Sequence, residues 1–161
     1  MRLAITCGLP CSGKAEFVQH MKQEGWVLLD PVNFRHAFSG EVFVKELENL
    51  VWAHVEVATK ALLDAGHNVL VSGMHPTALK RRGWKALAKQ FDAKLEIYYF
   101  NLKPELCKEI SLENGWDPDY VDRVRHYFEK PRKSEGTLYI MYENGEMPMV
   151  ELDAEQKTIT S

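Results

Sequence analysis

A glycine- and lysine-containing segment near the amino terminus has the residue types and spacing of a phosphate-binding loop. Residues 8–14 read Gly-Leu-Pro-Cys-Ser-Gly-Lys. Glycines let such a backbone curl so that successive N–H groups point at phosphate oxygens, and a helix that follows adds the positive end of its dipole. Lys14 would reach the outer phosphates as a point charge. The residues expected to hold a nucleotide are therefore Gly8, Leu9, Pro10, Cys11, Ser12, Gly13, Lys14 and Ala15.

The residue after the lysine departs from the usual pattern. A serine or threonine at this place normally supplies a hydroxyl ligand to Mg²⁺, whereas this chain has Ala15. A methyl group cannot bind a metal. We therefore expect Mg²⁺ to be held by phosphates, water and another side chain, for which Asp30 is the candidate, or the site to have lost part of its catalytic chemistry.

Two further residues have side chains suited to phosphoryl transfer. Asp30 follows the apolar run 26–29, so it would lie at the end of a strand, where it could accept the proton of a hydroxyl acceptor. The alternative is an aspartate that caps a turn or helix before Pro31. The guanidinium fork of Arg35 suits a phosphate oxyanion, or else it pairs with a nearby glutamate. Asn33 is a weaker candidate for substrate contact.

Three other side chains have a functional and a structural interpretation. His75 could contact the acceptor or act as a base because histidine titrates near ~6.5, or it is a solvated loop residue. Arg123 could swing towards the phosphates, or form a salt bridge with Asp119 or Asp122. The Cys11 thiol could be reactive because a helix N-terminus lowers a thiol pKa, or it is a tolerated small residue.

The densest group of basic residues lies between positions 80 and 85. It consists of Lys80, Arg81, Arg82 and Lys85, with Trp84 among them. Such a cluster could hold a nucleic-acid backbone. A solvated helix face with Trp84 in the core is the more common arrangement, and we expect it here.

Short apolar runs alternate with helical patterns and must position these residues. The expected strands are 2–6, 26–29, 68–71, 94–100 and 137–142, and the expected helices are 15–23, 34–38, 41–65, a helix after Thr77 that carries Leu79 to Ala88, 104–113 and 119–129. This alternation predicts an α/β domain with a mainly parallel five-stranded sheet and helices on both faces. The loops after Thr6, Leu29, Val71 and Phe100 should then converge on one cleft. We expect one domain over 1–142 and a polar tail over 143–161.

Composition limits the classes of protein that remain. The chain has 161 residues, 45% hydrophobic and 27% charged, which suits one globular domain. Its net charge of −3 lacks the basic excess of a non-specific nucleic-acid binder. Three widely spaced cysteines fit neither a disulfide framework nor a zinc site. No apolar run approaches the ~20 residues of a membrane span, so we expect a cytoplasmic protein without a membrane partner, and the oligomeric state stays open.

Several segments together resemble one group of enzymes. The chain is similar to P-loop kinases of the polynucleotide 5′-hydroxyl kinase group, with adenylylsulfate kinase as a relative, from Arg2 to Gly136. The resemblance rests on GLPCSGK at 8–14, LDPVNFRHAF at 29–38, AGHNVLVSGMHPTALKRRGWKALAKQF at 65–91 and FEKPRKSEG at 128–136. The first of these indicates the P-loop superfamily, and the last two point to this group.

The resemblance implies an ATP-dependent phosphotransferase that uses Mg²⁺ and moves the γ-phosphate to a hydroxyl. The acceptors that it implies are a nucleic-acid end, with a single strand among the alternatives, a nucleotide or a modified base. Lys14 and the loop would hold the phosphates, Asp30 would be the base or metal ligand, and Arg35 would orient the acceptor. Departures from the group's pattern leave two alternatives, a small-metabolite kinase resembling adenylylsulfate kinase and a catalytically degenerate nucleotide-binding regulatory domain. The departures are Ala15, Val32 in place of the group's acid, the Ser72–Pro76 loop without acid or amide, and the arginine-free segment Lys108–Asn114.

Overall fold

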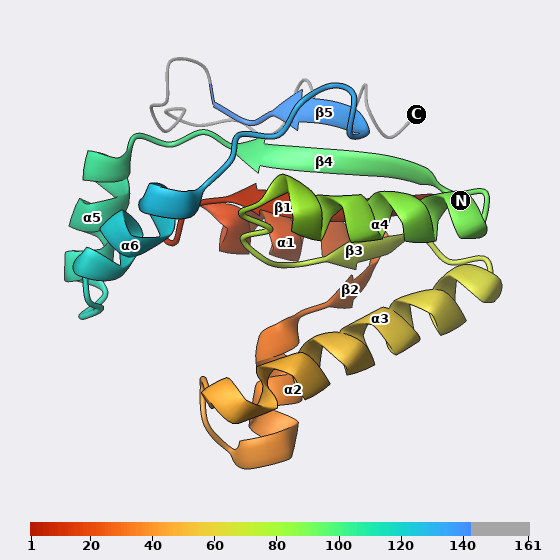
Figure 1. Cartoon of the computed structure of the whole chain (residues 1–161), viewed down its shortest axis with the longest axis horizontal. Coiled ribbons are helices and arrows are strands. Elements are labelled where there is room, and N and C mark those ends of the chain that lie inside the picture. Colours follow the sequence, from red (N-terminus) through yellow and green to blue (C-terminus); the bar gives the residue numbers. More distant parts are fainter. Residues whose placement is uncertain (143–161) are drawn as a thin grey trace.

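A five-stranded parallel sheet forms the centre of the molecule. The computed structural model describes residues 1–142, so the predicted tail at 143–161 lies outside the described residues. The strands are β1 Arg2–Gly8, β2 Val27–Leu29, β3 Val69–Val71, β4 Lys94–Phe100 and β5 Thr137–Ile140. They lie in the order β2-β3-β1-β4-β5, and every neighbouring pair is parallel (Figure 1). The predicted α/β class and the parallel sheet are therefore confirmed.

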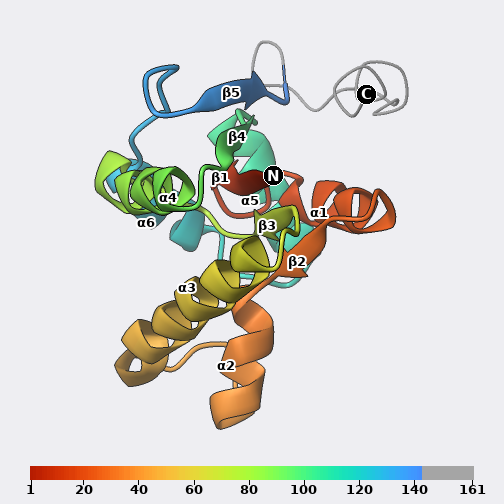
Figure 2. The same ribbon diagram turned by 90° about the vertical axis from the view of Figure 1, so that its right-hand side faces the viewer.

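Helices cover both faces of this sheet, as Figure 2 shows. They are α1 Lys14–Gln23, α2 Pro31–Ser39, the 3₁₀ turn η1 Lys45–Leu47, α3 Glu48–Asp64, α4 Ala78–Gln90, α5 Pro104–Glu113 and α6 Asp119–Tyr127. Residues of α1, α5 and α6 form one hydrophobic cluster with the sheet, and residues of α3 and α4 form the other. Because the carboxyl ends of all five strands meet at one edge, the loops that follow them share that edge.

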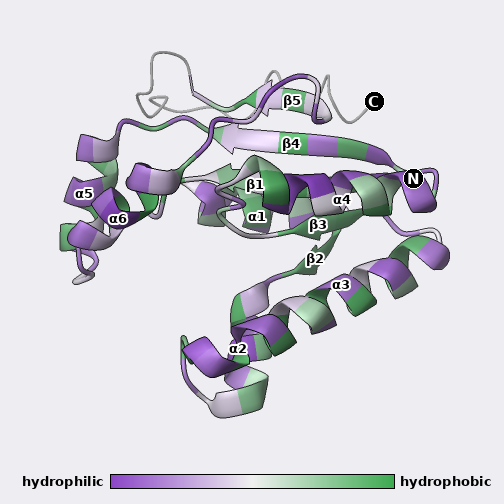
Figure 3. Cartoon of the chain, viewed as in Figure 1, coloured by the Kyte–Doolittle hydropathy of each residue, from purple (hydrophilic) through white to green (hydrophobic). Residues whose placement is uncertain are grey.

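The central strand is the most completely buried element. Leu3 to Gly8 of β1 are all buried, since both faces of the strand are covered. All three residues of β3 are likewise buried and apolar, whereas the helices alternate apolar and polar residues along their length (Figure 3). This packing gives the loop after β1 a rigid support on its strand side.

Residues at the two ends of α2 explain where this helix begins and ends. Asp30 is the N-cap of α2, and its carboxylate accepts a hydrogen bond from the Val32 N–H at 3.0 Å. Pro31 occupies the first helical position, where its missing N–H costs nothing. Gly40, in the left-handed conformation with φ 72°, ends the helix. The helix is longer than the predicted 34–38, because the cap and the proline start it earlier.

The long helix predicted over 41–65 is wrong at its beginning. The chain leaves α2 at Gly40, Val44 is extended, and α3 starts only at Glu48. Within the helix, the apolar side chain of Leu50 is exposed, whereas the polar side chain of Thr59 is buried. The Thr59 hydroxyl donates to the Val55 carbonyl at 2.7 Å, which satisfies it in the core. The last predicted helix is likewise shorter than 119–129, since α6 ends at Tyr127.

Candidate functional site

The loop between β1 and α1 has the backbone conformation that its glycines predict. Gly13 has φ 89° and precedes the first helical residue, and Cys11 also has a positive φ of 57°. A Cβ at Gly13 would collide with the Tyr142 hydroxyl, and one at Gly8 would lie 2.8 Å from Ser12 Oγ. Both positions therefore require glycine. The loop thus curls tightly into the N-terminus of α1, where backbone N–H groups and the helix dipole favour an anion.

Lys14 lies inside this loop. Its ammonium donates hydrogen bonds to the Gly8 carbonyl and to Ser12 Oγ, both at 3.1 Å, and to the Leu9 carbonyl. Burial of the amine lowers the pKa of Lys14 to about 8. A phosphate in the loop would compete with these neutral carbonyls for the ammonium, because charge-assisted hydrogen bonds are the stronger ones.

The loop offers few side-chain ligands for Mg²⁺. Ala15 presents a methyl group, and the Ser12 hydroxyl, which is fully buried, is engaged by Lys14. Among residues 1–142 no group of three His, Cys, Asp or Glu side chains could hold a metal ion. A magnesium ion would therefore be held mainly by nucleotide phosphates and water, which is a common arrangement for this ion.

The structure places Asp30 and Arg35 on α2, at the same sheet edge as the loop. Asp30 uses Oδ1 to cap its helix, as the structural interpretation expected. Arg35 donates two hydrogen bonds to Glu48, at 2.7 and 2.9 Å, so its fork is paired with a glutamate. These bonds raise the pKa of Arg35 and lower that of Glu48. Asn33 is exposed, and its N–H donates to the Asp30 carbonyl.

His75 is buried, so its interpretation as a solvated loop residue is wrong. Its ring lies edge-on to Trp52 and Trp84, with centroids 5.7 and 5.8 Å away. Nδ1 contacts the Thr6 carbonyl at 2.6 Å. Because a carbonyl only accepts, Nδ1 carries the proton, and Nε2 is a buried acceptor that has no partner among residues 1–142. This packing joins the loop after β3 to β1, just before the phosphate loop.

Burial lowers the pKa of His75 to about 4, which makes an acid-dependent loss of stability an expected outcome. An unfolded histidine takes up a proton near pH 6.5, whereas the folded ring stays neutral down to about pH 4. Between these values the unfolded state binds more protons. The free energy of unfolding should then fall as pH falls, by up to about 1.4 kcal/mol per pH unit from this group.

Urea unfolding of the wild type and of His75→Gln at neutral pH and near pH 4.5 measures this contribution. The glutamine cannot titrate, so the variant should lose less stability on acidification than the wild type. An equal loss in both proteins would show that His75 is not held neutral.

Neither Arg123 nor Cys11 has the environment that its functional interpretation needs. Arg123 is exposed and donates to Asp117 at 2.9 Å, so its partner is neither of the aspartates expected. Its guanidinium also lies 5.5 Å from the Tyr120 ring centroid. Burial raises the pKa of the Cys11 thiol, so the expectation of a lowered pKa is wrong.

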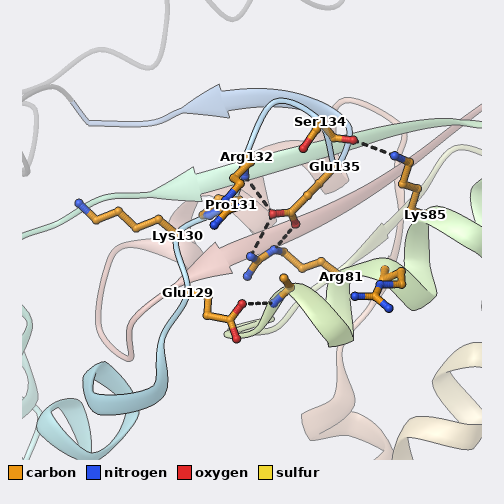
Figure 4. A pocket seen from close by; sticks show the side chains of 10 residues that line it. Arg81, Lys85, Glu129, Lys130, Pro131, Arg132, Ser134 and Glu135 are labelled. Atoms are coloured by element: carbon orange, nitrogen blue, oxygen red, sulfur yellow. Dashed lines mark hydrogen bonds and ion pairs between the residues drawn. The ribbon is translucent and has the colours of Figure 1, made fainter.

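Arg81 was expected on a solvated helix face, and the structure corrects this. The side chain is fully buried and forms a two-pronged ion pair with Glu135, at 2.6 and 3.2 Å. Its remaining nitrogen donates to the His75 carbonyl at 2.8 Å. Figure 4 shows this pair below the segment that leads to β5. Trp84 lies in the core as expected.

Both glutamates of the segment 128–136 bond to α4: Glu135 pairs with Arg81, and Glu129, although exposed, contacts the first residue of the helix. The Glu129 carboxylate accepts from the Ala78 N–H at 3.2 Å, and the Glu129 N–H donates to the Pro76 carbonyl at 2.8 Å. The segment therefore fastens α4 and the loop after β3 to the sheet. In sequence this appears only as a charged stretch far from its partners.

Comparison with known families and structures agrees with this geometry. A family model described as AAA domain (AAA_33) matches residues 3–111, which include the phosphate loop, Asp30, Arg35 and His75. No curated protein sequence matches the chain.

Solved structures of kinases have the same fold. A presumed kinase from Chloroflexus aurantiacus has a TM-score of 0.78 at 14% identity, over 98% of this chain and 93% of that one. The adenylylsulfate (APS) kinase CysC of Mycobacterium tuberculosis, in complex with AMPPNP and APS, has a TM-score of 0.67 at 16% identity, over 98% and 94%. A chain of the Pnkp1/Rnl/Hen1 complex has a TM-score of 0.60 at 22% identity, over 67% of this chain, which spans only 38% of that one. At these identities the likeness concerns the fold.

Proposed function

This chain belongs to the AAA-domain family whose model matches residues 3–111, and from that premise we propose that it is an ATP-dependent phosphotransferase. The proposed reaction moves the γ-phosphoryl group of ATP to a hydroxyl. The acceptor hydroxyl belongs to a nucleic-acid end, a nucleotide or a modified base. Several kinases share its fold, one of them in complex with a nucleotide analogue, AMPPNP.

The observation that carries the proposal is the position of Lys14. Its ammonium lies within the curl of the glycine loop and is bonded to backbone carbonyls on one side. Triphosphate oxygens bound by the loop N–H groups would meet this ammonium directly. It would then neutralise charge that develops on the transferred group, which is the main task in phosphoryl transfer.

Asp30 has the chemistry of a general base in this proposal. The acceptor oxygen attacks the γ-phosphorus, the new O–P bond forms, and the bond from that phosphorus to the β–γ bridging oxygen breaks. ADP leaves with the bond electrons, and the acceptor proton passes to the Asp30 carboxylate. Its position at the end of β2, on the edge that also bears the phosphate loop, supports this role. Mg²⁺ bound to the phosphates would supply further charge neutralisation.

A small-metabolite acceptor is the second candidate. Its support is the match to the APS kinase, which extends over nearly the whole of both chains. The signature at 128–136 and the basic residues of α4 support a nucleic-acid acceptor instead. Competition between a 5′-hydroxyl oligonucleotide and adenylylsulfate for phosphoryl transfer would separate these two.

Asp30→Asn tests the proposed base without removing its helix cap. Asparagine is as good an N-cap as aspartate, so α2 should remain intact. Without the carboxylate, the rate of phosphoryl transfer should fall by about 10²- to 10⁴-fold, the usual contribution of a general base. The measurement is ADP formation from ATP and Mg²⁺ with a panel of hydroxyl acceptors.

Asp64→Asn is the matched control, because this exposed aspartate ends α3. It should leave the rate unchanged. An Asp30→Asn variant with the wild-type rate would eliminate Asp30 as the base, and a wild type that converts no acceptor would contradict the proposed function.

A further inference from the structure

A cleft of about 740 Å³ lies between α4 and the segment 129–135. One wall is formed by Arg81, Arg82 and Lys85 of α4, and the other by residues 129–132 with Ser134 and Glu135. Figure 4 shows how the two walls face each other across the buried ion pair. Cavities of roughly 300–1,000 Å³ are those that hold small ligands, so the cleft has room for a nucleotide unit.

The cleft is positively charged although the chain as a whole is not. Its lining contains five basic side chains and two glutamates, which leaves an excess of three positive charges. The whole chain has a formal net charge of −3. The surplus positive charge is therefore concentrated at this place, and it comes from two segments that are distant in sequence.

The basic side chains of the cleft differ in whether they already bond to other groups of the protein. Arg81 is neutralised by Glu135, and Lys85 donates to the Ser134 carbonyl at 2.7 Å, so these groups form the floor and one rim. Arg82 and Lys130 are exposed and have no ion-pair partner among residues 1–142. In Figure 4 the Lys130 side chain extends away from the other wall. These two cations are thus available to an anionic ligand.

One end of the cleft adjoins the catalytic edge of the sheet. Glu129, which lines the cleft, donates its backbone N–H to the Pro76 carbonyl, and its carboxylate accepts from the Ala78 N–H. The loop that contains Pro76 also contacts the phosphate loop, since the Met74 carbonyl accepts from the Gly8 N–H at 3.1 Å. A chain that lay in the cleft would therefore have one end close to the site of phosphoryl transfer.

The chemistry of the lining favours a phosphodiester backbone over a protein segment. Of the ten lining residues, only Ala78 and Pro131 are apolar. Protein interfaces have an apolar, aromatic-rich core and are poor in lysine. Guanidinium forks match phosphate oxygens in two-pronged hydrogen bonds. The cleft lining is rich in arginine and lysine and poor in apolar residues, so it suits phosphate groups better than a protein segment.

We infer that the cleft between α4 and 129–135 binds the sugar–phosphate backbone of a single-stranded nucleic acid whose end is the phosphoryl acceptor. This inference rests on the proposed function, for which it names the substrate class. Arg82 and Lys130 contact phosphates, and the buried Arg81–Glu135 pair keeps the two walls in place.

Fluorescence anisotropy with a 5′-hydroxyl oligothymidylate, at several salt concentrations, tests the inference. The wild type should bind the strand, and the logarithm of its affinity should fall linearly with the logarithm of salt concentration. In Arg82→Gln/Lys130→Gln, binding should be weaker and the slope smaller by about 1.4, since each lost contact to a single strand removes about 0.7. ATP binding in the phosphate loop should be unchanged in this variant.

Lys22→Gln/Lys89→Gln is the matched control. These exposed lysines on α1 and α4 lie outside the cleft, and their loss changes the net charge by the same amount. Strand affinity should remain at or near the wild-type value. Equal weakening in both double variants, or binding of inorganic phosphate or polyglutamate as tight as that of the strand, would overturn the inference.

Two further outcomes distinguish a failure of the cleft inference from a failure of the proposed function. Lys14-dependent transfer from ATP to a mononucleotide, without binding of a strand, would overturn the cleft inference alone. Cleft-dependent strand binding without Lys14-dependent transfer to any acceptor would overturn the proposed function.

Discussion

Replacement of Lys14 by methionine is expected to reduce the rate of ATP-dependent phosphoryl transfer by about 10²- to 10³-fold. Loss of one preorganised donor to a developing anionic charge has this effect in other enzymes. Methionine keeps the length and much of the volume of the side chain but removes the ammonium that lies within the loop. Because the other loop contacts are backbone groups, the loop itself should persist. Initial rates of ADP formation under saturating acceptor measure the change.

The matched control is Lys22→Met, which changes an exposed lysine on the same helix. Its rate should equal that of the wild type. Circular dichroism should show both variants folded. A Lys14→Met protein with undiminished turnover would mean that the phosphate loop is not the site of the reaction.

Replacement of Arg81 by methionine is expected to lower the free energy of unfolding by about 3–5 kcal/mol. This is the usual effect of removing one partner from a buried ion pair. The Arg81 side chain is fully buried, and its loss would remove the only guanidinium paired with Glu135 among residues 1–142, together with its hydrogen bond to the His75 carbonyl. Urea unfolding followed by tryptophan fluorescence measures the difference.

An exposed ion pair provides the comparison. Lys108→Met breaks the pair with Asp122 on the surface, where solvent screens the two charges, so its free energy of unfolding should stay close to the wild-type value. In the double variant Arg81→Met/Glu135→Leu the unpaired charge is gone, so part of the lost stability should return. A loss below 1 kcal/mol in Arg81→Met would show that the buried pair does not hold α4 to the segment before β5.

The parts of the fold that local sequence determines were predictable. The short run at 2–6 predicted a strand, because it is rich in apolar and β-branched residues, but its central place in the sheet comes only from the fold. The glycines and lysine at 8–14 predicted the loop conformation, since its steric requirements lie within the segment itself. The same holds for the Asp30 cap, which depends on the two residues that follow it.

The parts that depend on distant contacts were not predictable in the same way. Arg81 and Glu135 are 54 positions apart, so nothing near Arg81 in sequence indicates that its charge is buried and paired. His75 is buried because Trp52 and Trp84 come from two other helices. The start of α3 was misjudged because the apolar residues before it continue a helical spacing, although Gly40 has already turned the chain. Pairing with a glutamate was the structural alternative for Arg35, and only the fold identifies that glutamate as Glu48.

The central claim is that the loop at 8–15 binds the phosphates of ATP, and calorimetric titration tests it most directly. ATP with Mg²⁺ would be titrated into the wild type, Lys14→Met and Lys22→Met. The account predicts one nucleotide per chain in the wild type and in Lys22→Met, and a severe loss of affinity in Lys14→Met. Absence of ATP binding by the wild type, or equal affinity in all three proteins, would contradict it.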